Sequence, residues 1–365
     1  MIDKTKFDVK GYYTAMAESK SLLIARDDLK WTEKWVDPDR PYDALLAYGC
    51  AVQHTPHLMQ EAANVLDVLG VDYFAVTGRQ FCCGRPFEKM GKDGTAADRI
   101  SDKSYRRFMS YRPKVAVQWC GACMRQYLDT ISSQQDPPFA VVHITKFLAD
   151  LLQARGDDVP WVRDVRTRVL LEAHHDHAQA DIDTAAILRI FEMVPGVEFA
   201  GFVEPPSAGT PCDLEGPKAV GVLNKSDTET FQGAIKELED QLEAAGADTL
   251  VTPYHKCQME WSKLSTKKMA IREWISLVAE AMGVGVQDRY TMYWHLGDPE
   301  KIAEEARPQW ETWGWTEEQA IEAARRHFVP EYAIDVHHCD CGGSGCGSEG
   351  AELLWPGLID VAALV

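Results

Sequence analysis

Five of the ten cysteines in this 365-residue chain lie between positions 50 and 123, in a pattern that suits metal binding. An adjacent pair stands at the centre, and a C-x-x-C motif closes the pattern. A disulfide between neighbouring residues closes a strained ring, which disfavours a structural bridge within the pair. Zinc takes four ligands, so five thiolates suit an iron–sulfur cluster better than one zinc ion. A zinc site and a set of buried free thiols are the alternatives. The five are Cys50, Cys82, Cys83, Cys120 and Cys123.

The order Cys, Cys-Cys-Gly, Cys-x-x-Cys, with gaps of 31 and 36 residues, resembles the CCG domain. This cysteine-rich module is named after the B subunit of heterodisulfide reductase. The resemblance is complete over residues 43–150 and weaker to about residue 265. It implies that the five cysteines hold one noncubane [4Fe-4S] cluster on which a disulfide is reductively cleaved. It also implies that Cys82 and Cys83 are the catalytic residues.

Other residues beside these cysteines suit supporting roles. Backbone N–H groups of Gly84 and Gly121 are placed to donate hydrogen bonds to cluster sulfurs and tune the potential. His54, His57 and Arg85 are candidates for supplying protons or binding an anionic substrate. Each of these three is individually more typical of a packing or surface residue.

Short apolar segments precede the ligand groups and predict the elements that position them. Pro56 suits a first helical position, and Gly70 suits the position just past the end of that helix. Strands alternating with helices, with ligands at strand ends, are typical of an open, mostly parallel α/β sheet. We predict strands at 42–48, 71–76 and 115–117 and helices at 56–69 and 96–109.

The same plan repeats from Asp164 to Trp261 with fewer cysteines. Aligning Leu170-Leu171 with Leu45-Leu46 places His175 on Cys50, Pro211-Cys212 on the cysteine pair, Tyr254 on Cys120 and Cys257 on Cys123. Three of five ligands are missing, so we expect the same fold without a matching cluster. One interpretation is a repeat without metal. The other is a single zinc or iron ion held by Cys212, Cys257 and one of His174, His175, His177 or His255, with His175 at the equivalent ligand position.

Composition divides the chain into four predicted parts. Residues 1–42 are an N-terminal extension, 43–160 a first CCG domain, 161–280 a second CCG-like domain, and 281–365 a helical extension with a Cys/Gly-rich tail. Within the extension, helices are predicted from Asp298-Pro299 to Trp310 and from Thr316 to His327. The tail contains Cys339, Cys341 and Cys346, which indicate either an additional metal site, a strap lending ligands to the second repeat, or a flexible terminus.

The formal net charge of −18 argues against nucleic acid and anionic membrane as partners. No apolar run reaches the roughly 18 residues of a membrane span, and the N-terminus lacks the apolar region of a secretory signal. We therefore expect a cytoplasmic protein, whose thiols stay reduced. The sequence has no G-x-G-x-x-G fingerprint between a strand and a helix, so a flavin or nicotinamide is expected on another protein of a complex.

One complete motif beside a depleted one resembles the heterodisulfide-reductase-like complexes of sulfur-oxidising bacteria. This resemblance implies an oxidoreductase subunit that acts on a disulfide or thiol, such as a lipoyl or sulfur-carrier protein. Its expected partners are a flavin-containing protein similar to the A subunit of heterodisulfide reductase and a ferredoxin-like protein similar to the C subunit. The alternative is a non-catalytic electron-relay or assembly subunit. The sequence leaves the substrate and the direction of electron flow open.

Overall fold

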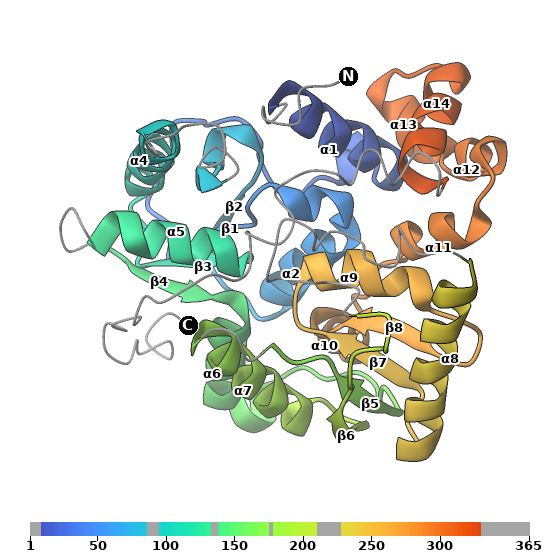
Figure 1. Cartoon of the computed structure of the whole chain (residues 1–365). Helices are drawn as coiled ribbons and strands as arrows, with labels where there is room; N and C mark the ends of the chain where they lie inside the picture. The colour runs from blue at the N-terminus through green and yellow to red at the C-terminus, as the bar shows by residue number, and fades with distance from the viewer. Residues whose placement is uncertain (1–8, 86–94, 133–137, 175–177, 210–227, 330–365) are drawn as a thin grey trace.

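Two four-stranded parallel sheets form the framework of the protein (Figure 1). The computed structural model describes residues 9–85, 95–132, 138–174, 178–209 and 228–329. Both sheets have the same topology, with strand orders β2-β1-β3-β4 and β6-β5-β7-β8. This confirms the predicted α/β class. The strands are β1 (Ala44–Ala47), β2 (Tyr73–Val76), β3 (Val115–Gln118), β4 (Ala140–His143), β5 (Thr167–Leu171), β6 (Val197–Phe202), β7 (Thr249–Thr252) and β8 (Ala270–Glu273).

The strand register confirms the internal repeat. Leu46 of β1 pairs with Val117 of β3, and Leu171 of β5 pairs with Val251 of β7. The central strands β1, β3 and β7 are buried along their whole length, because helices cover both faces of each sheet. Equivalent positions in the two halves are therefore related through these pairs, and Leu171 is the counterpart of Leu46.

Helices cover the sheets in layers. α2 (Pro56–Val68) and α6 (Ile144–Arg155) pack on one face of the first sheet, and α7 (Ala178–Met193) and α10 (Trp274–Ala281) pack on one face of the second. These four helices lie between the sheets, where α2 contacts α10 and α6 contacts α7. The opposite faces carry α4 (Thr95–Ser110), α5 (Gly121–Ser132), α8 (Thr228–Ala245) and α9 (His255–Trp261).

The largest hydrophobic core runs through both halves. It joins Leu46 of the first sheet, Leu66 of α2, Ile275 of α10 and Val251 of the second sheet in one cluster. A buried carboxylate adds a polar link across this joint. Glu61 of α2 accepts hydrogen bonds from Ser276 Oγ at 2.6 Å and from the backbone N–H of Val286 at 3.0 Å. The two halves are thus packed as one body.

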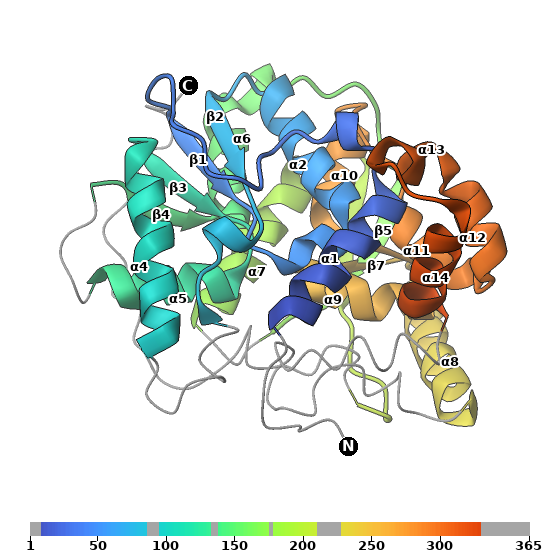
Figure 2. The same ribbon diagram turned by 90° about the horizontal axis from the view of Figure 1, so that it is seen from above.

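The N-terminal helix α1 (Val9–Leu23) lies against the C-terminal helices α13 (Arg307–Trp310) and α14 (Glu317–Phe328), as Figure 2 shows from above. Two further helices, α11 (Arg289–Leu296) and α12 (Pro299–Glu305), complete this region. Thr316 and Gln319 form the capping box that starts α14. The predicted helices at 298–310 and 316–327 are confirmed, with a break near Ala306. The segment of α1 also contacts the 3₁₀ turn η2 (Ala51–His54), which directly follows Cys50.

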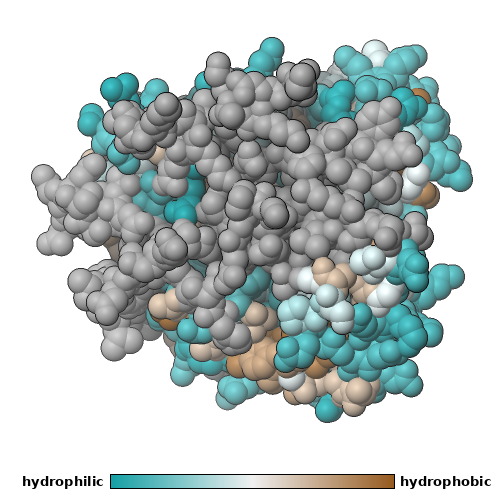
Figure 3. Space-filling model, in the orientation of Figure 1, coloured by the Kyte–Doolittle hydropathy of each residue, from teal (hydrophilic) through white to brown (hydrophobic). Residues whose placement is uncertain are grey.

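The described surface is mostly hydrophilic in the view of Figure 3, with an apolar area in its lower part. Large exposed apolar side chains include Phe199 and Phe202 of the edge strand β6, at 40% and 44% exposure. Across the described ranges, no helix combines the length and the apolar character that crossing a bilayer requires.

Candidate functional site

The structure brings the five cysteines of the first motif together. Cys50 follows β1, Cys82 and Cys83 follow β2 and the 3₁₀ turn η3 (Arg79–Phe81), and Cys120 and Cys123 stand at the start of α5 after β3. Parallel strands end at the same edge of a sheet, so these three segments converge there. Each thiol acts on the pKa of the next in the order Cys50, Cys82, Cys83, Cys123, Cys120, so the five lie close together.

None of these five thiols forms a disulfide, and all are buried apart from the partly exposed Cys120. The hydrogen bond from Cys123, together with backbone N–H groups at the start of α5, lowers the pKa of Cys120 to about 7 against the opposing effect of desolvation. Hydrogen bonds with Cys50 and Cys83 hold the pKa of Cys82 well below its usual range. The site therefore favours thiolate at two of five positions even without a cation, and thiolate is the form that binds metals.

Two glycines allow the segments that carry the cysteines to approach one another and their neighbours closely. Gly49 has φ of +81°, and a Cβ there would lie 3.0 Å from the Sγ of Cys123. Gly84 has φ of +90°, and a Cβ there would lie 2.4 Å from the carbonyl oxygen of Ala97. The N–H of Gly84 donates to the Sγ of Cys82 at 3.4 Å, whereas its predicted role as a donor to cluster sulfurs stays a prediction.

Two tyrosines of α1 that the sequence analysis missed lie against the thiols. The hydroxyl of Tyr12 is 3.1 Å from the Sγ of Cys50. Burial and the neighbouring Cys50 raise the pKa of Tyr12, which keeps the phenol protonated and able to donate. Burial, Cys50 and Cys82 likewise raise the pKa of Tyr13. No local motif marks these residues, because only tertiary packing brings α1 to Cys50.

A cavity of about 680 Å³ has Tyr13 in its lining, whereas none of the five cysteines lines it. Tyr13 relates the cavity to the thiols, since Cys50 and Cys82 act electrostatically on its hydroxyl and raise its pKa. Arg79, three residues before Cys82, also lines the cavity, together with Lys10, Lys20, Glu18 and Trp313. The cavity thus offers cationic and acidic groups and an aromatic wall around Tyr13.

His143 supports the other side of the motif. Its Nε2 lies 2.8 Å from the carbonyl oxygen of Trp119, the residue before Cys120, and its Nδ1 lies 3.0 Å from Asp183 Oδ1. Burial opposes the charged form, but the carboxylate of Asp183 outweighs it and raises the pKa of His143. The other candidates near the motif contact the C-terminal region: His57 pairs with Asp288 at 3.6 Å, and the ring of His54 packs near His327.

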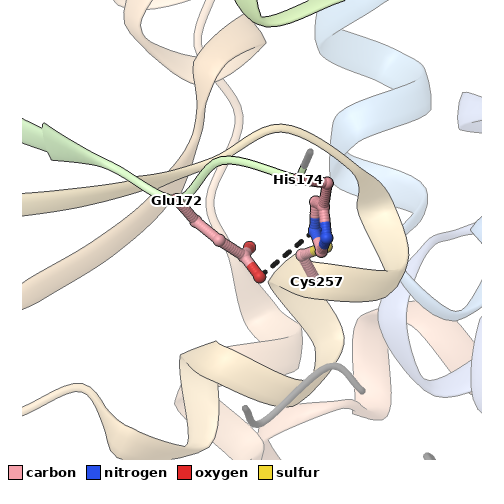
Figure 4. A group of neighbouring side chains, drawn as sticks. All are labelled: Glu172, His174 and Cys257. Atoms are coloured by element: carbon pink, nitrogen blue, oxygen red, sulfur yellow. Dashed lines mark hydrogen bonds and ion pairs between the residues drawn. The ribbon is translucent and has the colours of Figure 1, made fainter. Parts of the chain in front are cut away.

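In the second half, Glu172, His174 and Cys257 form a compact group (Figure 4). Their ligand atoms all lie within 4.8 Å of one another. Of the sequence candidates, His174 lies beside Cys257, whereas His255 is not part of this group, and burial lowers its pKa to about 3. Glu172 was missed. The other predicted positions lie outside the described residues: His175, His177, Pro211, Cys212, Cys339, Cys341 and Cys346.

Comparison with known proteins agrees with the cysteine pattern. Residues 44–127 match the sequence profile of the CCG cysteine-rich domain family. The D subunit of dihydromethanophenazine:CoB–CoM heterodisulfide reductase from Methanosarcina barkeri is 25% identical over 271 residues, which cover 71% of this chain and 64% of the relative. The same protein from Methanosarcina mazei is 24% identical with the same coverage, and that from Methanosarcina acetivorans is 23% identical over 277 residues, or 73% of this chain and 65% of the relative.

The chain spans less than two thirds of the length of these curated relatives. Among solved structures, an aspartate racemase homologue from Pyrococcus horikoshii matches 66% of this chain and 97% of its own, with 11% identity and a TM-score of 0.29, which is too low to bear on function. The profile match and the relatives together identify a CCG cysteine-rich domain at residues 44–127, in a chain distantly similar to the D subunit of heterodisulfide reductase.

Proposed function

We propose that this chain is the iron–sulfur subunit of a heterodisulfide-reductase-like complex. In this proposal, Cys50, Cys82, Cys83, Cys120 and Cys123 hold one noncubane [4Fe-4S] cluster. When bound, such a cluster supplies electrons one at a time to a disulfide, or accepts them from thiols. A flavin-containing protein and a ferredoxin-like protein are the proposed redox partners, and a lipoyl or sulfur-carrier protein is the proposed substrate.

The convergence of all five thiols at one sheet edge is the observation that carries this proposal. The residues fit the cofactor in three respects. The donor set is entirely sulfur, the Gly84 N–H donates to the Cys82 sulfur, and Gly49, which has no Cβ, lets the backbone beside Cys50 approach the Cys123 sulfur.

The cavity at Tyr13 favours a substrate role for Cys82 and Cys83. It is large enough for a small organic disulfide. Its lining carries the cations of Lys10, Lys20 and Arg79 against the carboxylates of Glu18 and Glu33, and this excess of positive charge suits a substrate with a carboxylate. Tyr13 lines the cavity, and burial together with Cys50 and Cys82 raises its pKa, so its hydroxyl stays protonated and able to donate a hydrogen bond.

A second candidate, a relay that only passes electrons, is favoured by the burial of the site. Cys82 is fully buried, and Cys50, Cys83 and Cys123 are 3–6% exposed. A cluster shielded to this degree suits electron transfer without substrate contact. The two candidates differ in whether a disulfide reaches the cluster.

Both are tested on anaerobically purified protein with iron and sulfide counted per chain. Each of the five Cys→Ser variants is expected to lose most visible absorption and iron, whereas Cys257→Ser, outside the motif, should keep both. Wild-type iron in all five variants would refute the ligand assignment. On reduced protein, an added small disulfide should change the electron paramagnetic resonance signal, and Cys82→Ser should abolish this change. An unchanged signal across a panel of disulfides, with normal electron exchange, would support the relay instead.

A further inference from the structure

The second half contains a set of metal-binding side chains that differs from the one its sequence repeat suggests. Glu172 and His174 lie on the segment that leaves β5, and Cys257 lies on α9, with the three side chains directed toward one another (Figure 4). His174 Nε2 is 3.1 Å from Cys257 Sγ and 3.3 Å from Glu172 Oε1. One nitrogen therefore faces both a thiol and a carboxylate.

Glu172 supplies an independent reason to expect a cation. Its side chain is only 5% exposed, and neither carboxylate oxygen accepts a hydrogen bond from any part of the chain that the structure describes. A buried acceptor without a hydrogen bond keeps the full penalty of its desolvation, and this penalty is larger when the group is charged. The backbone N–H of Glu172 is fixed on the carbonyl of Val251, so the side chain is held in this position. A cation between Oε1, Nε2 and Sγ would satisfy the carboxylate.

Comparison of the two halves explains why one ion suits this place. The strand register makes His174 the counterpart of Gly49 and Cys257 the counterpart of Cys123. In the first half, a Cβ at Gly49 would lie 3.0 Å from the Cys123 sulfur, so glycine lets the backbone approach this thiol. In the second half, the imidazole of His174 lies against the equivalent thiol. The three donors gathered there include one thiolate, a set that suits a single ion rather than a multi-iron cluster.

We propose that Glu172, His174 and Cys257 bind one zinc ion. Thiolate, imidazole and carboxylate are the three donor types that zinc accepts, and at such a site zinc binds more tightly than ferrous iron. One thiolate and one carboxylate neutralise the charge of the ion, which lowers the cost of burying it. Three protein donors leave the fourth tetrahedral position to a water or another small ligand. This assignment does not depend on the cluster of the first half.

The test uses the full chain, produced anaerobically with zinc in the medium, with zinc and iron counted separately. Wild-type protein should contain about one zinc per chain, and Cys257→Ser, His174→Gln and Glu172→Gln should each lower this to about 0.1 or less while iron stays unchanged. His255→Gln, a change at a neighbouring histidine outside the group, should keep zinc. Cys120→Ser should lose iron and keep zinc, which separates this proposal from that of the first half.

X-ray absorption at the zinc edge gives a readout that depends on neither activity nor the iron absorption. One sulfur at about 2.3 Å and nitrogen or oxygen donors at about 2.0–2.1 Å are expected. The isosteric Glu172→Gln variant, checked by circular dichroism and iron content, guards against loss of zinc through misfolding. Three results would overturn the proposal. Wild-type protein could contain iron but no zinc, zinc could remain bound after all three substitutions, or the zinc spectrum could show no sulfur ligand.

Discussion

The hydroxyl of Tyr254 donates a hydrogen bond of 2.9 Å to the Oδ2 of Asp183. By strand register, Tyr254 occupies the place that Cys120 holds in the first half. Asp183 in turn faces His143, whose Nε2 contacts the carbonyl of the residue before Cys120. The residue at the counterpart of Cys120 in the second half therefore helps to fix the turn that carries Cys120 in the first.

Replacing Asp183 with Asn should destabilise the protein in a pH-dependent way. Asp183 raises the pKa of His143 in the fold above its ordinary value of about 6.5, so the stabilisation is fully present below that value and is lost as pH rises through the raised pKa. Removing one partner of a buried pair costs about 3–5 kcal/mol of stability. We therefore expect the free energy of unfolding of Asp183→Asn to lie below that of wild type by this order at pH 6, and the difference to become smaller above neutral pH.

Urea unfolding across a pH series measures this difference. Thr145→Val is the matched control, because it removes a neutral hydrogen bond of 2.6 Å to the same carboxylate. Its effect should be smaller and nearly independent of pH. A gap between wild type and Asp183→Asn that stays constant from pH 5 to pH 9 would show that the pair is not ionic.

Replacing Tyr12 with Phe should lower the reduction potential of the proposed cluster without loss of iron. Its hydroxyl lies 3.1 Å from Cys50 Sγ, and a donor to a ligand sulfur stabilises the reduced, more negative state. A hydrogen bond of about 1 kcal/mol corresponds to about 40 mV for one electron. A redox titration followed by electron paramagnetic resonance measures the shift. Tyr73→Phe, whose hydroxyl bonds Ala63 and Asp67, should leave the potential unchanged.

Replacing Gly84 with Ala should cost more stability than the same change at another glycine of positive φ. A Cβ at Gly84 would lie 2.4 Å from the carbonyl oxygen of Ala97, whereas a Cβ at Gly156 would meet no atom within 4 Å. In both variants, a residue with a Cβ must adopt a positive φ, which lowers the free energy of unfolding by about 1–2 kcal/mol. Gly84→Ala should lower the free energy of unfolding by about 1–3 kcal/mol more than Gly156→Ala, because the loop that carries Cys82 must shift. The same shift should lower the iron content of Gly84→Ala. Equal unfolding midpoints and equal iron would contradict this account.

Elements coded by local sequence were predictable. Pro56 and Gly70 delimit α2, the cap at Thr316 starts α14, and the cysteine spacing located the thiol site at the strand ends. The alignment of the second repeat agrees with the strand register for Tyr254 and Cys257, since Leu171 pairs with Val251 as Leu46 pairs with Val117. The division into domains stays a prediction.

Residues that reach the sites through tertiary packing were not predictable. Tyr12 is 38 residues from Cys50 and lies in an extension whose docking no motif records. Glu172 looked like an ordinary residue at a strand end, and only the three-dimensional structure joins it to Cys257 on another element. Among the residues that the structure describes, the histidine beside Cys257 is His174, which stands at the counterpart of Gly49, a position whose side chain faces that thiol.

The shared core and the buried carboxylate of Glu61 have a consequence for proteolysis. The connection between the halves runs over the surface near Val162, which is 64% exposed, while Glu61 on α2 is hydrogen-bonded to Ser276 and Val286 on the other side of the joint. A protease that cuts this connection would break one covalent bond but leave the packing between α2 and α10 intact. The two fragments would therefore stay associated, and each would expose the apolar face of its inner helices only if they were pulled apart.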